Sequence, residues 1–361
     1  MLCIVSFFIL LVLSIFSAPK RKLLKQSWSC VTRRVTFRAC DASFAHDIRT
    51  KVLAPVALKV PRLVRPLSGL ITLAAWVTII SLVSMMYIVL RGGLNLIAYG
   101  TCDRAEPEAC LLTGQEACGI PSDDPGFLEL IFQGNVVGAF RQEITSMGDT
   151  LQTIGTRFRH WDAAEFAPEF ASFKGGYREG LPVVMEILDP GCIFCARLAE
   201  NIAESGIAET TNVTYLLYPI LREGEPEFPH SYLIAQYLTA IRIFEHGTPA
   251  ANNPTDWALL YKMFSENEPQ RGVNWQVWFN AVATPEQALE QLHTWLTDLG
   301  YSETDIARVS SLAASEQVAQ ILTESRYTVD HRIRTITIPT LIADGSIHRG
   351  LVSVEQLRRM G

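Results

Sequence analysis

The chain has little of what a metal site needs. It contains a single Cys-x-x-Cys pair, Cys192 and Cys195, and no second pair of that spacing. The histidines that follow are scattered singly, at His230, His246, His293, His331 and His348. A structural zinc site takes four ligands, usually two such pairs or one pair with spaced histidines, so the sequence does not favour zinc. Copper capture by two exposed thiols stays an alternative. We expect no metal ion and no cofactor.

The sequence also lacks internal repeats, low-complexity tracts and the motifs of a folded nucleic-acid-binding domain. Residues 19–68 hold 12 Lys or Arg and only two Asp. Such a loop is more typical of contact with anionic lipid head groups than with nucleic acid. Residues 91–361 hold 19 basic and 35 acidic residues, a net charge of −16, which repels nucleic acid. We expect no nucleic-acid partner.

Charge is absent altogether from residues 69–90, a run of 22 residues. At about 1.5 Å per residue, a helix of this length crosses the roughly 30 Å hydrocarbon layer of a membrane. A buried core helix would show a polar stripe, whereas only scattered Thr and Ser interrupt this run. The run therefore predicts a transmembrane helix.

A second apolar run, residues 1–18, has no basic residue before it and four soon after it. A secretory signal peptide has the opposite order of charge. We therefore expect a second membrane span, with the basic loop 19–68 in the cytoplasm and residues from about 92 onward outside. The alternative is an N-terminal extension or mis-set start with one anchor at 69–90, which leaves the same part outside.

This topology assigns the cysteines to redox compartments. Cys30 and Cys40 would face the reducing cytoplasm, where disulfides are rare. Five cysteines would face outside: Cys102, Cys110, Cys118, Cys192 and Cys195. Because five is odd, one thiol is either free or shared between chains. We expect one disulfide within the chain among the first three, and a bridge between two chains through whichever of the three remains.

The outer part divides by composition into a Cys-containing juxtamembrane segment at 91–126, a helical stalk at 127–175 and a folded domain at 176–361. In the stalk, apolar residues recur at alternating spacings of four and three, at Phe140, Ile144, Met147, Leu151, Ile154, Phe158 and Trp161. This spacing is typical of a heptad seam and predicts a homodimer through 140–161. Packing of an amphipathic helix on its own domain is the alternative.

The folded domain begins with strand-like apolar runs at 181–188 and 212–221, with a helix-favouring stretch after Cys195 between them. This spacing is that of a parallel β-α-β crossover unit. Residues 228–334 show helical spacing throughout. A β-branched run at 335–343, an Asp344-Gly345 turn, a short strand at 348–351 and a helix at 353–360 complete an α/β domain.

The position of the cysteine pair favours redox chemistry. A static disulfide across two residues closes too short a loop to stabilise the chain much. Cys192 would lie in the first turn of a helix, where free backbone N–H groups and the helix dipole stabilise a thiolate. Pro190 and Gly191 would turn the chain from strand into helix and expose that sulfur. Cys195, one turn later, would lie on the same face and attack a mixed disulfide from inside.

Two further residues support this interpretation. Glu186 lies six residues before Cys192 in an otherwise apolar strand, and alternation predicts a buried carboxyl that holds its proton. A solvent-facing Glu on a half-exposed strand is the alternative. Pro339 lies in a β-rich run, although a central strand does not tolerate a proline. A cis Ile338–Pro339 peptide beside the cysteines would explain its presence there.

These residues resemble the thioredoxin superfamily: an acid six residues before a Cys-x-x-Cys at a helix start, and Ile-Pro-Thr before a final strand and helix. The helical insertion at about 228–334 resembles the bacterial periplasmic Dsb-type branch. The resemblance covers residues 181–361. It implies that Cys192 attacks, Cys195 resolves, Glu186 relays protons, and Pro339, with Ile338, Ile193 and Phe194, contacts an extended substrate.

The resemblance implies a thiol–disulfide oxidoreductase that acts on exported proteins, held in the bacterial inner membrane with its catalytic domain in the periplasm. It would work with a redox partner protein. Ile193 and Phe194 replace the histidine-containing dipeptide of strongly oxidising members, so we expect a reductase or isomerase rather than a primary oxidase. A non-catalytic, thioredoxin-like assembly subunit of an envelope complex is the alternative.

Overall fold

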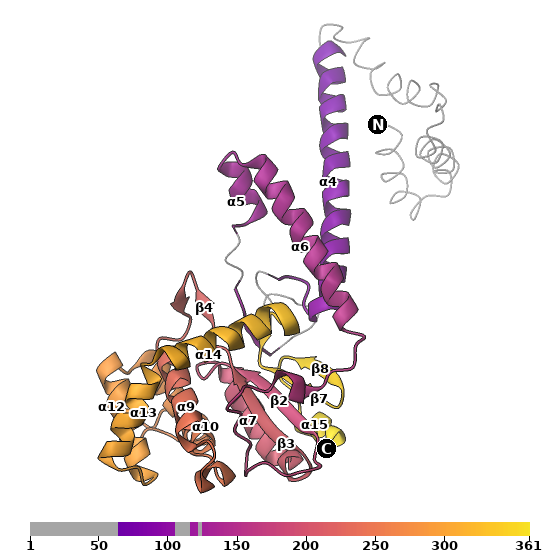
Figure 1. Ribbon diagram of the computed structural model, residues 1–361. Helices are drawn as coiled ribbons and strands as arrows, with labels where there is room; N and C mark the ends of the chain where they lie inside the picture. The colour runs from indigo at the N-terminus through magenta and orange to yellow at the C-terminus, as the bar shows by residue number, and fades with distance from the viewer. Residues whose placement is uncertain (1–63, 105–115, 122–124) are drawn as a thin grey trace. The chain divides into compact units, whose positions relative to one another are not determined.

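The computed structural model describes residues 64–104, 116–121 and 125–361 (Figure 1). The chain divides into two units, Met1–Leu90 and Arg91–Gly361. The expected span at 1–18, nearly all of the basic loop at 19–68, and Cys30, Cys40 and Cys110 lie outside the described residues.

The predicted transmembrane run lies within a long helix, α4, Val64–Tyr99. Within the described residues, one helix is long and apolar enough to cross a membrane, over Trp76–Tyr99, with a mean hydropathy of 1.8. Its most apolar stretch has no buried residue, and Met86 is 68% exposed. The helix extends beyond the expected 69–90, because residues 91–99 continue in helical conformation and pack on a later helix.

The sheet at the centre of the second unit has the strand order β3-β2-β7-β8. Strands β2 (Val183–Leu188) and β3 (Asn212–Leu217) are parallel, while β7 (Thr340–Ala343) and β8 (Ser346–Arg349) add antiparallel strands. Between β2 and β3 lie α7 (Ile193–Ser205) and α8 (Ile207–Thr210), and α15 (Val354–Met360) ends the chain. This is a thioredoxin-like fold. The predicted fold class is confirmed.

Side-chain alternation along β2 determines what each face of the sheet buries. Val184 packs with Leu198 and Ile202 of α7 and with Leu357 of α15. Met185 and Ile187 point to the other core, which the helical insertion completes. The hairpin between β7 and β8 turns at Asp344-Gly345, with φ values of 47° and 67°, as the sequence predicted.

The helical insertion is present as expected. Its elements are α9 (Ser231–Glu245), η4 (Pro249–Asn252), α10 (Thr255–Ser265), α11 (Trp275–Ala281), α12 (Pro285–Asp298), α13 (Glu303–Ala313), α14 (Glu316–Tyr327) and the π-helical η5 (Thr328–Ile333). In Figure 1 its helices α9, α10, α12 and α13 lie on the opposite side of the sheet from β8, while α14 runs back toward β8. A buried carboxylate joins the insertion to the sheet. Asp256 accepts hydrogen bonds from Arg242 at 2.8 Å and from Tyr215 of β3 at 2.6 Å.

The stalk region differs from the expected continuous seam. It forms α5 (Phe127–Phe132) and α6 (Val136–Thr156), followed by η3 (Ala163–Phe166). Because α6 ends at Thr156, Phe158 lies beyond it, and Trp161 is buried in the core of the folded domain. The buried face of α6 is polar and small, at Ala139, Thr150 and Thr153.

That polar face packs on the end of α4. Thr150 donates to Asn95 at 3.2 Å, Tyr99 and Thr153 hydroxyls lie 3.2 Å apart, and Arg91 pairs with Glu143 at 3.0 Å. The apolar seam residues Phe140, Ile144 and Leu151 therefore remain exposed, at 57%, 72% and 55%. These three residues do not pack on the folded domain, whereas Trp161 at the end of the seam does.

Two short two-stranded sheets complete the description. One pairs β4 (Leu221–Arg222) with β5 (Glu225–Pro226). The other pairs β1 (Cys118–Gly119) with β6 (Thr337–Ile338), in antiparallel orientation. The second pairing brings the juxtamembrane region against the strand that precedes Pro339.

Candidate redox site

Cys192 is the N-cap residue of α7, at the carboxyl end of β2. The turn between them needs glycine at position 191, because a Cβ there would lie 2.3 Å from the Cβ of Phe228. The Cys192 N–H donates to the Asp189 carbonyl at 3.1 Å, and the Cys195 N–H donates to the Cys192 carbonyl at 3.0 Å. The predicted placement of the pair at a helix start is confirmed.

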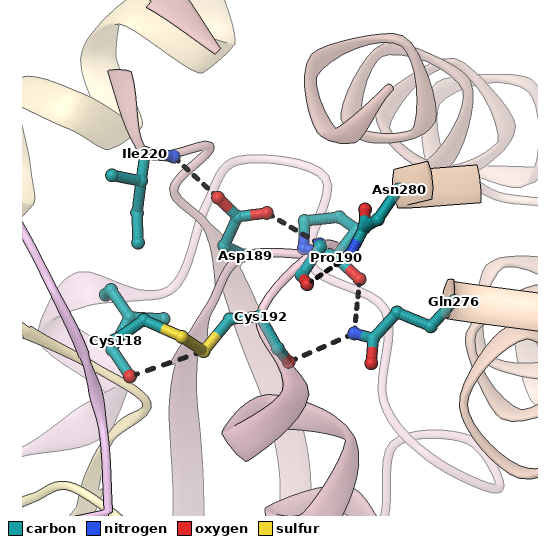
Figure 2. Close-up of a disulfide and its surroundings, with 9 residues drawn as sticks. Cys118, Asp189, Pro190, Cys192, Ile220, Gln276 and Asn280 are labelled. Carbon is teal, nitrogen blue, oxygen red and sulfur yellow. Dashed lines mark hydrogen bonds between the residues drawn. A yellow bond between two sulfur atoms is a disulfide. The ribbon is translucent and has the colours of Figure 1, made fainter. Parts of the chain in front are cut away.

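Helix α11 of the insertion contacts the turn before Cys192 from the side opposite Cys118 (Figure 2). The Gln276 side-chain amide donates to the carbonyls of Pro190 and Cys192 at 2.7 and 3.0 Å. The Asn280 amide donates to the Gly191 carbonyl at 2.8 Å. The sequence analysis missed both residues, since nothing local marks an amide on a helix more than 80 positions away.

Asp189 is a second residue that the sequence analysis missed. Its side chain is fully buried and accepts from the backbone N–H groups of Gly191 at 2.7 Å and Ile220 at 2.6 Å (Figure 2). Burial raises the pKa of this carboxyl to about 7, and the two backbone bonds act against the increase. Asp189 thus ties the cysteine turn to the end of β3.

The pairing of the cysteines is the largest departure from the sequence-based expectation. Cys192 forms a disulfide with Cys118, 74 residues earlier in the chain, and Cys195 is the one free thiol among the cysteines that the structure describes. Because Cys118 is bonded to Cys192, it does not form the expected disulfide between two chains. Cys102 is disulfide-bonded as well.

The Cys192 sulfur was expected to be exposed, and it is fully buried. The reason is the segment that carries Cys118. It lies directly over the start of α7 and pairs with β6, so it covers the sulfur that the turn presents. Spacing alone could not show this, because residues 92–126 have no periodic pattern.

Ile338 and Pro339 lie against the disulfide, as the resemblance implied. The Ile338–Pro339 peptide is cis, which confirms the prediction. The Ile338 carbonyl oxygen lies 3.6 Å from Cys192 Sγ, and Ile338 is the register partner of Cys118. A disulfide sulfur carries no proton, so this contact becomes a hydrogen bond only when Cys192 is a thiol.

Cys195 is fully buried behind Cys192, one turn along α7. Burial raises the pKa of its thiol well above the usual value, and the negative charges of Glu186 and Asp189 raise it further. The thiol therefore keeps its proton at neutral pH. It needs a base to become a nucleophile.

Glu186 supplies a candidate base. It is 1% exposed, which excludes the solvent-facing alternative. Burial raises the pKa of its carboxyl to about 8, and the positive charge of Lys174 acts against that increase. Its Oε1 atom has no hydrogen-bond partner among the described residues.

A cavity of about 230 Å³ reaches Glu186 from the side of Lys174 and Trp257. A cavity of this size has room for water, and Lys174 and Glu186 in its otherwise largely apolar lining can hydrogen-bond water that carries a proton between the buried carboxyl and solvent. The Glu186 charge thus acts on the buried Cys195 thiol, and the cavity gives a proton on Glu186 a path to solvent.

The two residues between the cysteines form the rim of the site. Ile193 is 51% exposed, and Phe194 is partly buried against the core. The guanidinium of Arg197 lies 5.7 Å from the ring centroid of Phe194 and 3.4 Å from the carboxylate of Glu116. The rim is thus apolar at the sulfur and charged one turn further along.

Among residues 64–104, 116–121 and 125–361, no group of three or more His, Cys, Asp or Glu side chains is arranged to hold a metal ion.

Comparisons with known proteins give matches among solved structures only, since no family model and no curated protein matches the chain. The chain is similar to a thioredoxin-like oxidoreductase from Silicibacter pomeroyi, with 15% identity and a TM-score of 0.38 over 54% of this chain and 92% of that one. It is also similar to the thiol-disulfide exchange protein alpha-DsbA2 from Wolbachia pipientis, with 14% identity and a TM-score of 0.37 over 61% and 95%.

A third similar structure is MdbA, a thiol-disulfide oxidoreductase from Corynebacterium diphtheriae, with 15% identity and a TM-score of 0.35 over 51% of this chain and 91% of that one. The fold assignment itself depends on the strand order and pairing described above.

Proposed function

We propose that this protein is a membrane-anchored thiol–disulfide oxidoreductase of a bacterial envelope that acts on cysteines of exported proteins. The observation that carries the proposal is the stack of Cys192, Cys195 and Glu186. A sulfur lies at a helix N-terminus, a buried thiol lies one turn behind it, and a carboxyl with a raised pKa lies in the strand beneath.

The reaction balances within this arrangement. In the reduced protein, the Cys192 thiolate attacks one sulfur of a substrate disulfide, and that S–S bond breaks as a mixed disulfide forms. The departing substrate thiolate takes a proton. Cys195 then loses its proton to Glu186 and attacks Cys192 Sγ, which releases the second substrate thiolate. Two electrons have passed to the substrate, and a dithiol partner protein must return them.

Reduction or isomerisation suits the residues better than primary oxidation. Ile193 and Phe194 carry no charge, so they add nothing to the stabilisation of a Cys192 thiolate by the helix N-terminus. A less stabilised thiolate makes the corresponding disulfide less oxidising. The direction of electron flow can be measured by equilibrating the protein with glutathione.

In this proposal, helix α4 is the membrane anchor. A helix apolar over Trp76–Tyr99 would hold the catalytic unit at the bacterial inner membrane, with residues from about 92 onward in the periplasm. That compartment allows disulfides to persist.

Turnover of insulin disulfides by the full-length chain in detergent, with dithiothreitol as the reductant, tests the function. We expect turnover after full reduction, its loss in Cys192→Ser, and no change in Cys40→Ser, a matched substitution far from the pair in sequence. A wild-type chain with no turnover above the reductant alone would favour a non-catalytic assembly subunit.

A further inference from the structure

The segment that carries Cys118, residues 116–121, occupies the edge of the redox site as an extended strand. It pairs in antiparallel orientation with β6, with Cys118 opposite Ile338 and Gly119 opposite Thr337. The Ile120 N–H donates to the Ile336 carbonyl at 2.8 Å, which continues the same ladder. We call residues 116–121 the Cys118 segment.

The other end of the Cys118 segment is held more weakly. The Glu116 carbonyl accepts from the Leu351 N–H at 2.9 Å, and the Glu116 carboxylate pairs with Arg197 at 3.4 Å. Both partners of that ion pair are about half exposed, so solvent screens their attraction and the pair contributes little to holding the segment. Most of the contacts are backbone hydrogen bonds, which any extended chain can make.

Resting on the proposed function, we propose that the Cys118 segment is an internal substrate of this site and that Cys118 is its third redox thiol. The bond between Cys118 and Cys192 then has the form of a mixed disulfide, the species that Cys195 resolves. A permanent structural disulfide would instead remove Cys192 from chemistry.

The exchange balances without any outside reagent. The Cys195 thiolate attacks Cys192 Sγ, the bond from Cys192 to Cys118 breaks, and a Cys192–Cys195 disulfide forms. Cys118 leaves as a thiolate and takes the proton that Cys195 gave up. The numbers of disulfides and of thiols are unchanged.

The buried environment of Cys195 explains how the Cys118 form persists. Its thiol keeps its proton because burial and the neighbouring carboxyls disfavour the thiolate, so the attack on Cys192 is slow until a base accepts that proton. Glu186 is placed to accept it, and the cavity beside it connects to solvent.

Release of the Cys118 segment would free the β6 edge for another extended chain. Unpaired strand edges accept such chains through backbone hydrogen bonds. The residues that flank Cys118 are small, Ala117 and Gly119, and Ala117 is only 2% exposed. The partner that best replaces the segment is therefore an extended peptide with a cysteine between small residues.

Trypsin gives a direct test, because Cys192 and Cys195 lie on one peptide, 179–197, and Cys118 lies on another, 105–141. The full-length chain, purified in detergent without reductant, is incubated at pH 8 with iodoacetamide, quenched in acid and digested. We expect Cys118 to become labelled with time, while peptide 179–197 separates from 105–141 and is two hydrogens lighter than its dithiol form.

Cys195→Ala is the decisive variant. It cannot perform the exchange, so we expect the two peptides to stay linked and Cys118 to lose its labelling. If the wild-type peptides stay linked as well, the disulfide is a static staple and the inference is wrong. Equal labelling of Cys118 in the wild type and in Cys195→Ala would also overturn it, since release would then follow another route.

The outcome is separate from that of the insulin assay. Labelling of Cys118 without insulin turnover would leave the internal exchange established and the proposed function refuted. Insulin turnover by the fully reduced chain, together with permanently linked peptides in the unreduced chain, would support the proposed function and refute the internal exchange. If both hold, the unreduced wild type should show a lag in insulin turnover that Cys118→Ser removes.

Discussion

At the scale of single residues, the chemistry depends on groups kept neutral by burial. Glu186 and Asp189 both lie in or next to β2, and burial raises the pKa of each carboxyl by several units. A protonated carboxyl under Cys195 avoids an unpaired buried charge while the site rests. Its ionised form provides the base when exchange occurs. One residue thus serves both states.

Glu186→Gln should make the protein more stable at high pH. The folded carboxyl, with a pKa of about 8, holds a proton that the unfolded one releases above about 4.5, so the stability of the wild type falls as pH rises from about 4.5 to about 8. Glutamine cannot ionise. The difference in free energy of unfolding should therefore grow in favour of the variant by up to about 1.4 kcal/mol per pH unit and level off above pH 8.

Unfolding followed by tryptophan fluorescence from pH 5 to pH 9 measures this difference, and the contribution of Asp189 cancels in it. A difference that does not change with pH would show that Glu186 is not buried as a neutral acid. The same variant should slow labelling of Cys118, because Cys195 loses its base.

The positions of several candidate site residues could be predicted from local patterns. Helix spacing and strand alternation place Cys192, Cys195 and Glu186, and the conflict of Pro339 with a strand marks its cis peptide, while the chemical roles of these residues stay predictions. Cys118 could not be predicted, because its partner is 74 residues away and its own segment has no periodic pattern. Asp189 was part of the Asp-Pro-Gly turn, but its bond to Ile220 depends on where β3 ends.

At the scale of elements, the helical insertion stabilises the site as well as the core. Helix α11 contributes three hydrogen bonds to three consecutive carbonyls, those of Pro190, Gly191 and Cys192. The Cys192 carbonyl also accepts from the Cys195 and Ala196 N–H groups of α7, whereas the Pro190 and Gly191 carbonyls lie before the first turn and depend on α11. The helical character of residues 228–334 could be predicted from spacing, whereas the contact of α11 with the cysteine turn requires the packed arrangement.

Gln276→Ala should loosen the cysteine turn. It leaves the Pro190 carbonyl without its donor, which costs about 1–3 kcal/mol for a buried group without a partner, while the Cys192 carbonyl keeps its bonds to α7. We expect a lower unfolding midpoint and faster alkylation of Cys195 in the reduced protein. Gln320→Ala is the matched control, because Gln320 is exposed and bonds only to Glu324. Equal effects of the two changes would contradict a role in holding the turn.

The exposed face of α6 is the element that most needs a partner. Phe140, Ile144 and Leu151 stay exposed because the opposite face of α6 packs on α4. We propose that a second copy of the chain covers them, since a membrane anchor concentrates copies in two dimensions. Ile144→Glu with Leu151→Glu should shift the full-length protein in detergent from dimer to monomer, as measured by light scattering.

The control for that change is Leu299→Glu, which alters another exposed leucine, the C-cap residue of α12 in the insertion. It should leave the mass unchanged. A wild-type chain that is already monomeric would refute self-association through α6. The outcome does not affect the redox site, which one chain completes.

At the scale of the whole molecule, charge is divided between two segments of opposite sign. Residues 19–68 carry a net charge of +10 and residues 91–361 a net charge of −16. Lys and Arg near membrane spans favour the cytoplasmic side, so the basic segment predicts which side each part faces. The five cysteines from Cys102 onward then lie where disulfides form, which agrees with the bonded states of Cys102, Cys118 and Cys192.

This topology gives the last prediction. Alkaline phosphatase needs its own disulfides and is active only outside the cytoplasm. Fused after Gly361 it should therefore be active in bacterial cells, whereas fused after Ser68 it should be inactive. Reversing the charge of Arg62 and Arg65 to Glu, which lie directly before the apolar run, should lower the activity of the first fusion, because it removes basic residues that retain this end of α4 inside. Activity in the fusion after Ser68 with none after Gly361 would invert the topology, and it would place Cys118 and Cys192 in a reducing compartment where their bond could not persist.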